Sequence, residues 1–264
     1  MSTGSYNFER LEDASFQTER LYQQSRAIRG MEAGLLRTAG LAADHDVLEV
    51  GSGPGFVTDL LAELAPAGSV HAVEPSPALC AQIEANVHGK PARGLFVLQA
   101  LGDALPLDDG CIDFSYARFV LQHVPRPADV IGEIHRVTRP GGRFCAVDSD
   151  DGLVILHPED GRVAQVLHDA QAIQAGQGGD RFVGRKLQEK MIAAGFTNVR
   201  SRVLMLTSSE LPFQVLFNIL LGYKASLLGG SVDVRALYED LAQRVASGRL
   251  MLAAGVFIVS GEKV

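Results

Sequence analysis

The chain has 264 residues, of which 47% are hydrophobic and 21% charged, a balance typical of a globular protein with a large core. Its formal net charge is −7 and it has no run of basic residues, which argues against nucleic-acid binding because phosphate recognition requires clustered Lys and Arg. The three cysteines are scattered, the N-terminal segment lacks the apolar core of a secretory signal, and no later stretch is long enough to span a membrane. We therefore expect a cytoplasmic protein that is not attached to a membrane.

The first forty residues have a helical pattern, and from about residue 44 to residue 148 short apolar runs alternate with longer amphipathic ones. We expect strands at residues 46–50, 69–75, 94–100, 111–117 and 141–148, and helices at residues 55–65, 76–89 and 127–138. A strand–helix alternation at this spacing predicts right-handed βαβ units, which form a parallel sheet with helices on both faces.

The pattern changes after residue 148, where the segment SDDGLVILHPEDG (residues 149–161) is expected to be a loop. Beyond it we expect helices at residues 162–175 and 184–195, a sixth strand at 197–208, helical structure over 210–247 and a last strand at 249–263. The prediction is a single domain spanning residues 1–264, with a core at about 41–206 and 250–264 and a helical cap from about 1–40 and 207–249.

A glycine-rich turn follows the first strand of this pattern, in the sequence VLEVGSGPG of residues 47–55. In open α/β sheets a ligand lies at the carboxyl ends of the strands, where the strand order reverses. Side chains in the turn would block the approach of such a ligand, so Gly51, Gly53 and Gly55 are expected to lie beside it. A plain tight turn is the alternative interpretation.

Two acidic residues at neighbouring strand ends favour a ligand that contains adenosine. Glu74 ends the second strand, where a carboxylate can accept hydrogen bonds from both hydroxyls of a ribose. Asp103 follows the third strand, where it can accept a hydrogen bond from the exocyclic amine of adenine.

The sequence of the turn disfavours a dinucleotide, which stays an alternative, and excludes the Walker loop of a nucleoside triphosphate site. The nicotinamide pattern G-x-G-x-x-G requires glycine at position 56, where the chain has Phe56, and no Gly-Lys-Ser/Thr follows as in a Walker loop. Glu49, two residues before Gly51, is unfavourable for a pyrophosphate and suits a cation. S-adenosylmethionine is such a ligand, because it joins an adenosine to a sulfonium and an ammonium group.

Five segments together resemble a known family: VLEVGSGPG, AVEPS, LGDALPL, YARFVLQHVPRPADVIGEIHRVTRPGGRF and KMIAAGF. Their order and spacing over residues 44–206 are similar to those of class I, Rossmann-like S-adenosylmethionine-dependent methyltransferases of the ubiquinone/menaquinone-biosynthesis type. The resemblance implies an α/β fold with a seven-stranded, mostly parallel twisted sheet, an antiparallel last strand, helices on both faces and a helical cap.

The resemblance also implies which residues contact the cofactor. Its methionine half would lie against Glu49, Gly51, Ser52, Gly53 and Gly55, its ribose on Glu74, and its adenine beside Pro75, Asp103 and Ala104. Ala117 and Arg118 would line its amino-acid end. Arg118 departs from the neutral residue of the family, so contact with the carboxylate of the cofactor, contact with an anionic substrate and a structural surface role are all open.

Methyl transfer is an in-line displacement with a neutral thioether as leaving group, so positioning and the exclusion of water supply much of the rate. A general base is needed only if the acceptor holds its proton at neutral pH. His123 is the candidate base and Asp148 a second candidate, while local packing or loop capping is the alternative for each. The spacing of DSDDG does not match a calcium loop and no zinc spacing occurs, so we expect no metal.

The segment at residues 212–230 is apolar on more than one helical face, so it must be buried in the cap, in a homodimer interface or along a substrate pocket. The candidate substrate contacts are Tyr22, His157, Phe213, Phe217 and Tyr223, with Tyr6, Phe16 and Tyr22 as a candidate lid. We expect methyl transfer to O, N or C of a small hydrophobic or aromatic metabolite. A non-methylating S-adenosylmethionine-binding protein, such as a cyclase, and an NAD-dependent oxidoreductase are the alternatives.

Overall fold

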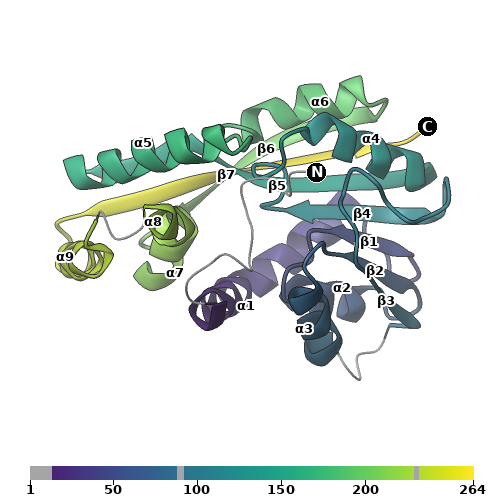
Figure 1. Cartoon of the computed structure of the whole chain (residues 1–264), viewed down its shortest axis with the longest axis horizontal. Helices are drawn as coiled ribbons and strands as arrows, with labels where there is room; N and C mark the ends of the chain where they lie inside the picture. The colour runs from purple at the N-terminus through teal and green to yellow at the C-terminus, as the bar shows by residue number, and fades with distance from the viewer. Residues whose placement is uncertain (1–13, 88–91, 229–231) are drawn as a thin grey trace.

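The computed structural model describes residues 14–264 apart from 88–91 and 229–231 (Figure 1). It contains a seven-stranded sheet in the order β3-β2-β1-β4-β5-β7-β6. The strands are β1 (Val47–Val50), β2 (Ser69–Val73), β3 (Gly94–Leu98), β4 (Ile112–Arg118), β5 (Thr138–His157), β6 (Thr197–Thr207) and β7 (Met251–Glu262). β1 to β5 pair in parallel, whereas β7 runs antiparallel to both β5 and β6. The predicted sheet with its antiparallel last strand is thus confirmed.

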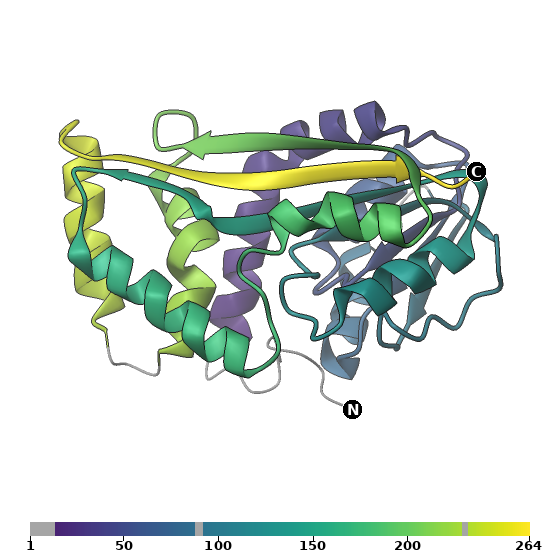
Figure 2. The ribbon, with the colours of Figure 1, turned by 90° about the horizontal axis from the view of Figure 1, so that it is seen from above.

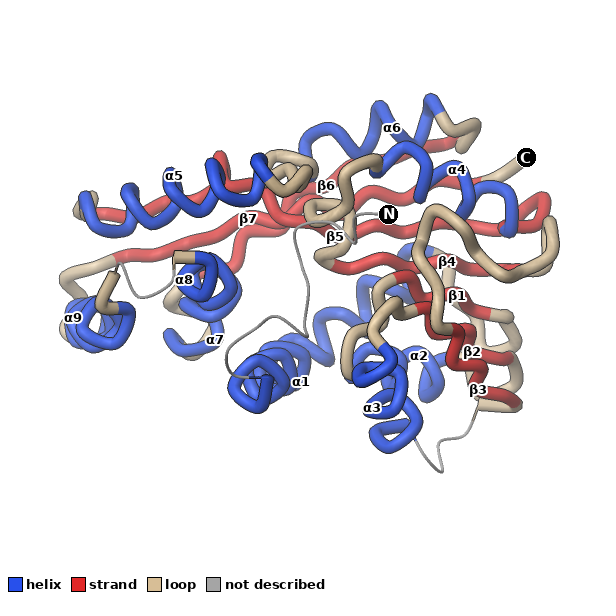
Figure 3. The backbone as a smooth tube through the Cα atoms, viewed as in Figure 1, coloured by secondary structure: helices blue, strands red, loops and turns tan. Residues whose placement is uncertain are grey.

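Helices cover both faces of the sheet (Figures 1 and 3). On one face lie α1 (Ala14–Ala39), α2 (Phe56–Leu64) and α3 (Pro77–Val87), and on the other lie α4 (Pro127–Val137) and α6 (Leu187–Ala193), which follows the short helix η2 (Gly184–Lys186). Successive side chains of β5 enter different cores: Cys145 and Val147 pack under α1 and α2, whereas Phe144 and Ala146 pack under α4 and α6. This alternation is the two-residue period of a strand buried on both faces.

Three strands extend beyond the doubly covered part of the sheet and carry a third hydrophobic core (Figure 2). Its helices are α5 (Gly161–Gly176), α7 (Phe213–Phe217), η3 (Asn218–Gly222), α8 (Tyr223–Leu227) and α9 (Val234–Ala246). Leu216, Leu241 and Leu252 are fully or almost fully buried there. The region therefore has an apolar interior of its own, and its division from the rest of the domain remains our proposal.

The expectation of a loop at residues 149–161 is wrong, because β5 continues through most of this segment, paired with β7 across a register shift. Charged residues hid the strand from the sequence pattern. Asp150 and Asp151 are both buried, and each has a guanidinium partner: Arg185 at 2.5 Å and Arg181 at 3.0 Å, respectively. Paired carboxylates are tolerated inside a strand, since the partner offsets the cost of burying the charge.

The turn between β1 and α2 has three glycines with positive φ, and a side chain at each of them would meet different surroundings. A Cβ at Gly51 would overlap the side chain of Val120, and a Cβ at Gly55 would lie 2.9 Å from the backbone Cα of Ile83 in α3. At Gly53 a Cβ would meet nothing within 4 Å. Gly55 therefore permits close packing of α3 on the turn, while Gly53 leaves open space.

We predict that Gly55→Ala lowers the free energy of unfolding by about 3 kcal/mol, because backbone strain adds to a clash with a neighbouring helix. Gly53→Ala is the matched control and should cost only about 1 kcal/mol, the strain of a left-handed residue without a clash. Urea denaturation of both variants measures the difference. Equal losses of unfolding free energy in the two variants would show that α3 does not pack tightly against Gly55.

Candidate functional site

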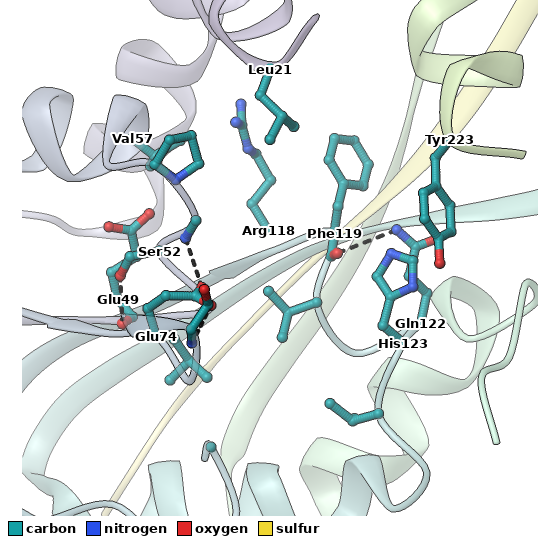
Figure 4. A pocket seen from close by; sticks show the side chains of 18 of the residues that line it. Leu21, Glu49, Ser52, Val57, Glu74, Arg118, Phe119, Gln122, His123 and Tyr223 are labelled. Atoms are coloured by element: carbon teal, nitrogen blue, oxygen red, sulfur yellow. Dashed lines mark hydrogen bonds between the residues drawn. The ribbon is translucent and has the colours of Figure 1, made fainter. Parts of the chain in front are cut away.

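A cavity of about 330 Å³ lies at the carboxyl ends of β1, β2, β3 and β4 and beside Ser149 in the middle of β5, where the strand order reverses between β1 and β4. The close-up shows two groups of side chains on opposite sides of it (Figure 4). One side, which we call the acidic end, has Glu49, Ser52, Gly53 and Glu74. The other, which we call the basic end, has Gln122, His123 and Tyr223. Arg20, Arg181 and Lys224 also line the cavity, and because their charges act on His123 we count them with the basic end.

Glu74 is held in place by two backbone N–H groups. Gly53 donates to one of its carboxylate oxygens at 3.0 Å and Ser76 to the other at 3.1 Å. Burial raises the pKa of Glu74, and the two hydrogen bonds oppose that rise. Each oxygen keeps a further lone pair, so the fixed carboxylate offers two acceptors for a pair of neighbouring hydroxyls.

Glu49 is only 4% exposed and accepts a hydrogen bond from the hydroxyl of Thr58 at 2.5 Å. Burial raises the pKa of Glu49 to about 8, although Thr58 and Arg118 favour the ionised form and Glu32 opposes it. The carboxyl group therefore holds its proton at pH 7. A cation bound beside it would favour ionisation, since the buried negative charge would then have a partner.

These residues fit a ligand such as S-adenosylmethionine. Gly53 lines the cavity and leaves open the space that a side chain would fill. The acidic end thus combines paired acceptors, a carboxyl group beside the glycine turn and an unobstructed backbone, as an adenosyl cation requires.

Arg118 lines the cavity and ties β4 to α1. Its guanidinium contacts Glu32 at 2.9 Å and the hydroxyl of Ser25 at 2.8 Å, while the hydroxyl of Tyr116 donates to Glu32 at 2.7 Å. Both charged side chains are almost fully buried. Arg118 therefore has an internal role in holding α1 over the cavity, which differs from the structural surface role considered from the sequence.

His123 lies at the basic end, with its ring edge-on to Tyr223 at 5.0 Å between centroids. Burial lowers the pKa of His123 well below its usual value, and the charges of Arg181, Arg20 and Lys224 lower it further, so the ring is neutral at pH 7. The amide nitrogen of Gln174 donates to the carbonyl of Gln122 at 3.0 Å and lies 3.2 Å from His123 Nδ1. Nδ1 is then the acceptor, which leaves the proton on Nε2.

The buried cations of the basic end were not predicted from the sequence. Arg20 and Arg181 are each 6% exposed and Lys224 is 2% exposed. A lysine within an apolar segment was the available signal, because a buried ammonium group requires a partner in the fold. Arg20 and Arg181 stand in unremarkable polar surroundings in the sequence. Phe119, which has a positive φ at the end of β4 and lines the cavity, was also missed.

The cavity brings together nine of the predicted site residues: Glu49, Gly51, Ser52, Gly53, Glu74, Pro75, Arg118, His123 and Tyr223. Four others lie behind or beside its wall. Gly55 packs on α3, Ala117 belongs to the core under α4, and Asp103 contacts Arg126 at 3.3 Å next to the exposed Ala104.

Asp148 is buried behind the loop that follows β4. It accepts hydrogen bonds from the backbone N–H of Gln122 at 3.1 Å and of Ser149 at 2.9 Å. Burial raises the pKa of Asp148 to about 7, and these hydrogen bonds and Arg181 oppose the rise. The side chain of Asp148 is not among those that line the cavity, so its position favours a role in capping the loop after β4 over a role in catalysis.

The remaining candidates for substrate contact lie away from the cavity lining. His157 is exposed at the far end of β5, and Phe213 and Phe217 stack with Tyr238 in the third core. Tyr22 is 41% exposed and packs edge-on against Phe56, which does line the cavity. Of the candidate lid, Tyr6 and the side chain of Phe16 lie outside the described residues.

Over the part of the chain that the structure describes, no group of three or more His, Cys, Asp or Glu side chains is placed to hold a metal ion. Among the same residues, none of the helices is both long and apolar enough to cross a bilayer.

The sheet order and the position of the cavity define the class I, Rossmann-like methyltransferase fold. Residues 48–146 match the family described as methyltransferase domain, in agreement with the motifs of the sequence. S-adenosylmethionine, the predicted cofactor, is the cofactor of this class. The likeness to the ubiquinone/menaquinone type in particular remains a prediction.

Relatives and solved structures agree with this assignment. An uncharacterised 37.1 kDa protein of transposon TN4556 from Streptomyces fradiae is 33% identical over 175 residues, and an uncharacterised methyltransferase from Mycobacterium bovis is 40% identical over 96 residues. The matches cover 64% and 36% of this chain, but only 48% and 36% of those proteins.

Two solved structures share the fold at low sequence identity. The Haemonchus contortus phosphoethanolamine N-methyltransferase 2 in complex with S-adenosylhomocysteine has a TM-score of 0.58 at 16% identity, covering 89% of this chain and 53% of that one. The [4+2]-cyclase SpnF has a TM-score of 0.56 at 16% identity, covering 90% and 83%. The same fold therefore carries both methyl transfer and a cyclisation in these proteins.

We predict that Glu49 makes the protein less stable as the pH rises. The pKa of Glu49 is about 8 in the folded chain against an ordinary 4.5, so between these pH values the folded state holds a proton that the unfolded state has released. The folded state therefore loses on the order of 4 kcal/mol of stability as the pH rises from 4.5 to 8. Glu49→Gln lacks this titration. Urea unfolding from pH 5 to pH 9 should show the stability of the native chain falling relative to the variant, and parallel profiles would contradict the assignment.

Proposed function

We propose that the protein is an S-adenosylmethionine-dependent methyltransferase that acts on a small molecule. One observation carries the proposal: Glu49, Glu74 and the open backbone of Gly53 converge on a single cavity at the reversal of strand order. The net charge of −7 speaks against a nucleic-acid acceptor, and the three unpaired cysteines favour a reducing compartment such as the cytoplasm.

When bound, the cofactor supplies an activated methyl group on a sulfonium whose departure leaves a neutral thioether. Glu74 would accept the two ribose hydroxyls, and Glu49 would release its proton and face the cationic half of the ligand. α1, held by the Glu32–Arg118 ion pair, would limit the entry of water. Asp103 and Ala104 remain proposed neighbours of the adenine, since the adjoining Leu101 and Gly102 line the cavity.

The acceptor would lie at the basic end, beside Phe119, Leu220 and Tyr223. These side chains support an acceptor with an apolar or aromatic part, whose reacting atom is O, N or C. His123 presents an N–H at Nε2 in the tautomer that Gln174 favours, so we propose that it orients the acceptor by donating a hydrogen bond. A role as general base would require the other tautomer.

A reaction other than methyl transfer on the same cofactor is the second candidate, because the cyclase SpnF shares this fold. An NAD-dependent oxidoreductase is less well supported, since Phe56 replaces the third glycine of the nicotinamide pattern.

Calorimetry with S-adenosylmethionine, S-adenosylhomocysteine and NADH separates these candidates at the level of binding. We expect binding of the two adenosyl compounds and none of NADH. Incubation of a metabolite extract with the cofactor labelled on its methyl group then tests turnover. A labelled product supports methyl transfer, whereas binding without any labelled product favours the second candidate.

We predict that Glu74→Ala weakens binding of S-adenosylhomocysteine at least about tenfold, because two hydrogen bonds to a charged acceptor are lost. Glu84→Ala, on the exposed face of the adjacent helix α3, is the matched control and should bind as the native chain does. Isothermal titration measures both. Unchanged affinity in the Glu74 variant would mean that the ribose lies elsewhere.

A further inference from the structure

The basic end gathers three cations from distant parts of the chain. Arg20 belongs to α1, Arg181 to the turn before η2, and Lys224 to α8, and all three line the cavity. The Cδ atom of Arg20 reaches η3, where a Cβ at Gly222 would lie only 2.9 Å from it. Charge from each of the three lowers the pKa of His123, so all three lie near this ring. Buried cations in a cavity are costly unless a negative group meets them.

Asp151 is the carboxylate that Arg181 and Lys224 share. One of its oxygens lies 3.0 Å from both the Arg181 guanidinium and the Lys224 ammonium, so a single negative charge serves two positive ones. The pKa of Lys224 falls to about 7 because burial and Arg181 outweigh the attraction of Asp151. The pair of cations is therefore only partly compensated by the carboxylate between them.

Lys224 and Arg181 keep N–H groups beyond the contacts that the described residues make with them. Among the described residues, Lys224 Nζ donates to Asp151 and to the carbonyl of Leu220, which uses two of its three N–H groups. Arg181 contacts Asp151 and the side-chain oxygen of Gln122, which leaves part of its five N–H donors for a ligand. Arg20 donates from Nε to Gln17 at 2.9 Å, and its guanidinium also lines the cavity.

In the part of the chain that the structure describes, two more acidic side chains of β5 are already engaged. Asp150 pairs with Arg185, and Asp148 is capped by two backbone N–H groups behind the cavity wall. Burial also raises the pKa of Asp148 to about 7, which reduces its negative charge at neutral pH. We therefore infer that a negatively charged group of a ligand compensates the cations of the basic end.

We propose that the acceptor substrate carries an anionic oxygen group, a carboxylate or a phosphate, which binds at the basic end against Arg20, Arg181 and Lys224. This inference rests on the proposed methyl transfer and narrows its substrate class. The apolar part of the acceptor would then lie against Phe119 and Tyr223, between the anion and the transferred methyl group. Ion pairing in a buried site fixes orientation as well as affinity.

The test separates a metabolite extract by ion exchange into anionic, neutral and cationic fractions, and supplies each with native protein and methyl-labelled cofactor. We expect labelled product from the anionic fraction. Phosphatase treatment of that fraction then distinguishes the two sources, since it removes a phosphate and leaves a carboxylate. Label only in the neutral or cationic fraction overturns the inference while methyl transfer stands. No label in any fraction, despite cofactor binding, removes the proposed function and the inference together.

Variants test the site itself. The active fraction is supplied at one fixed dilution, and the initial rate of methyl transfer is measured. Lys224→Met and Arg20→Gln should each lower this rate by about tenfold or more, while their affinity for S-adenosylhomocysteine stays unchanged. Lys186→Met, outside the cavity, and Arg26→Gln, on an exposed turn of the same helix α1, are the matched controls and should match the native rate. Native rates in the two cavity variants would place the anion elsewhere and overturn the proposal.

Discussion

The buried carboxylate of Asp151 is the interaction on which the wall of the cavity depends. It lies within β5, and it holds Arg181 from the turn before η2 and Lys224 from α8, each at 3.0 Å. Loss of one partner from a buried ion pair leaves an uncompensated charge that costs about 3–5 kcal/mol. Both cations are therefore kept in place, and with them the two segments that close the cavity opposite the glycine turn.

The sheet and the acidic end could be predicted from the sequence because their signals are local. Each strand and helix of residues 44–148 is visible as a short apolar run or an amphipathic stretch. Glu49 and Glu74 stand at strand ends, and parallel strands bring these ends together whatever the rest of the chain does. The spacing of the glycines adds a requirement for positive φ that few other residues meet.

The basic end could not be predicted because its partners are far apart in the sequence. In the sequence, Asp151 and Lys224 are charged residues that interrupt apolar segments. Asp151 contributed to the prediction of a loop where β5 continues. Only the fold shows that the two residues pair. The aromatic residues Phe213 and Phe217 were expected at the substrate, but they fill the third core, since tertiary packing decides which face of an all-round apolar helix meets a cavity.

The cavity is assembled from residues inside and outside the segment that matches the methyltransferase family. Residues 48–146, which match the methyltransferase family, provide the acidic end, whereas Arg20, Arg181 and Lys224 all lie outside that segment. If the acidic end binds the methyl donor and the basic end the acceptor, as we propose, the choice of acceptor can change without weakening the binding of the methyl donor. Exchanging α1, the turn before η2 and α8 together between relatives is thus a practical route to chimeric enzymes with altered acceptors.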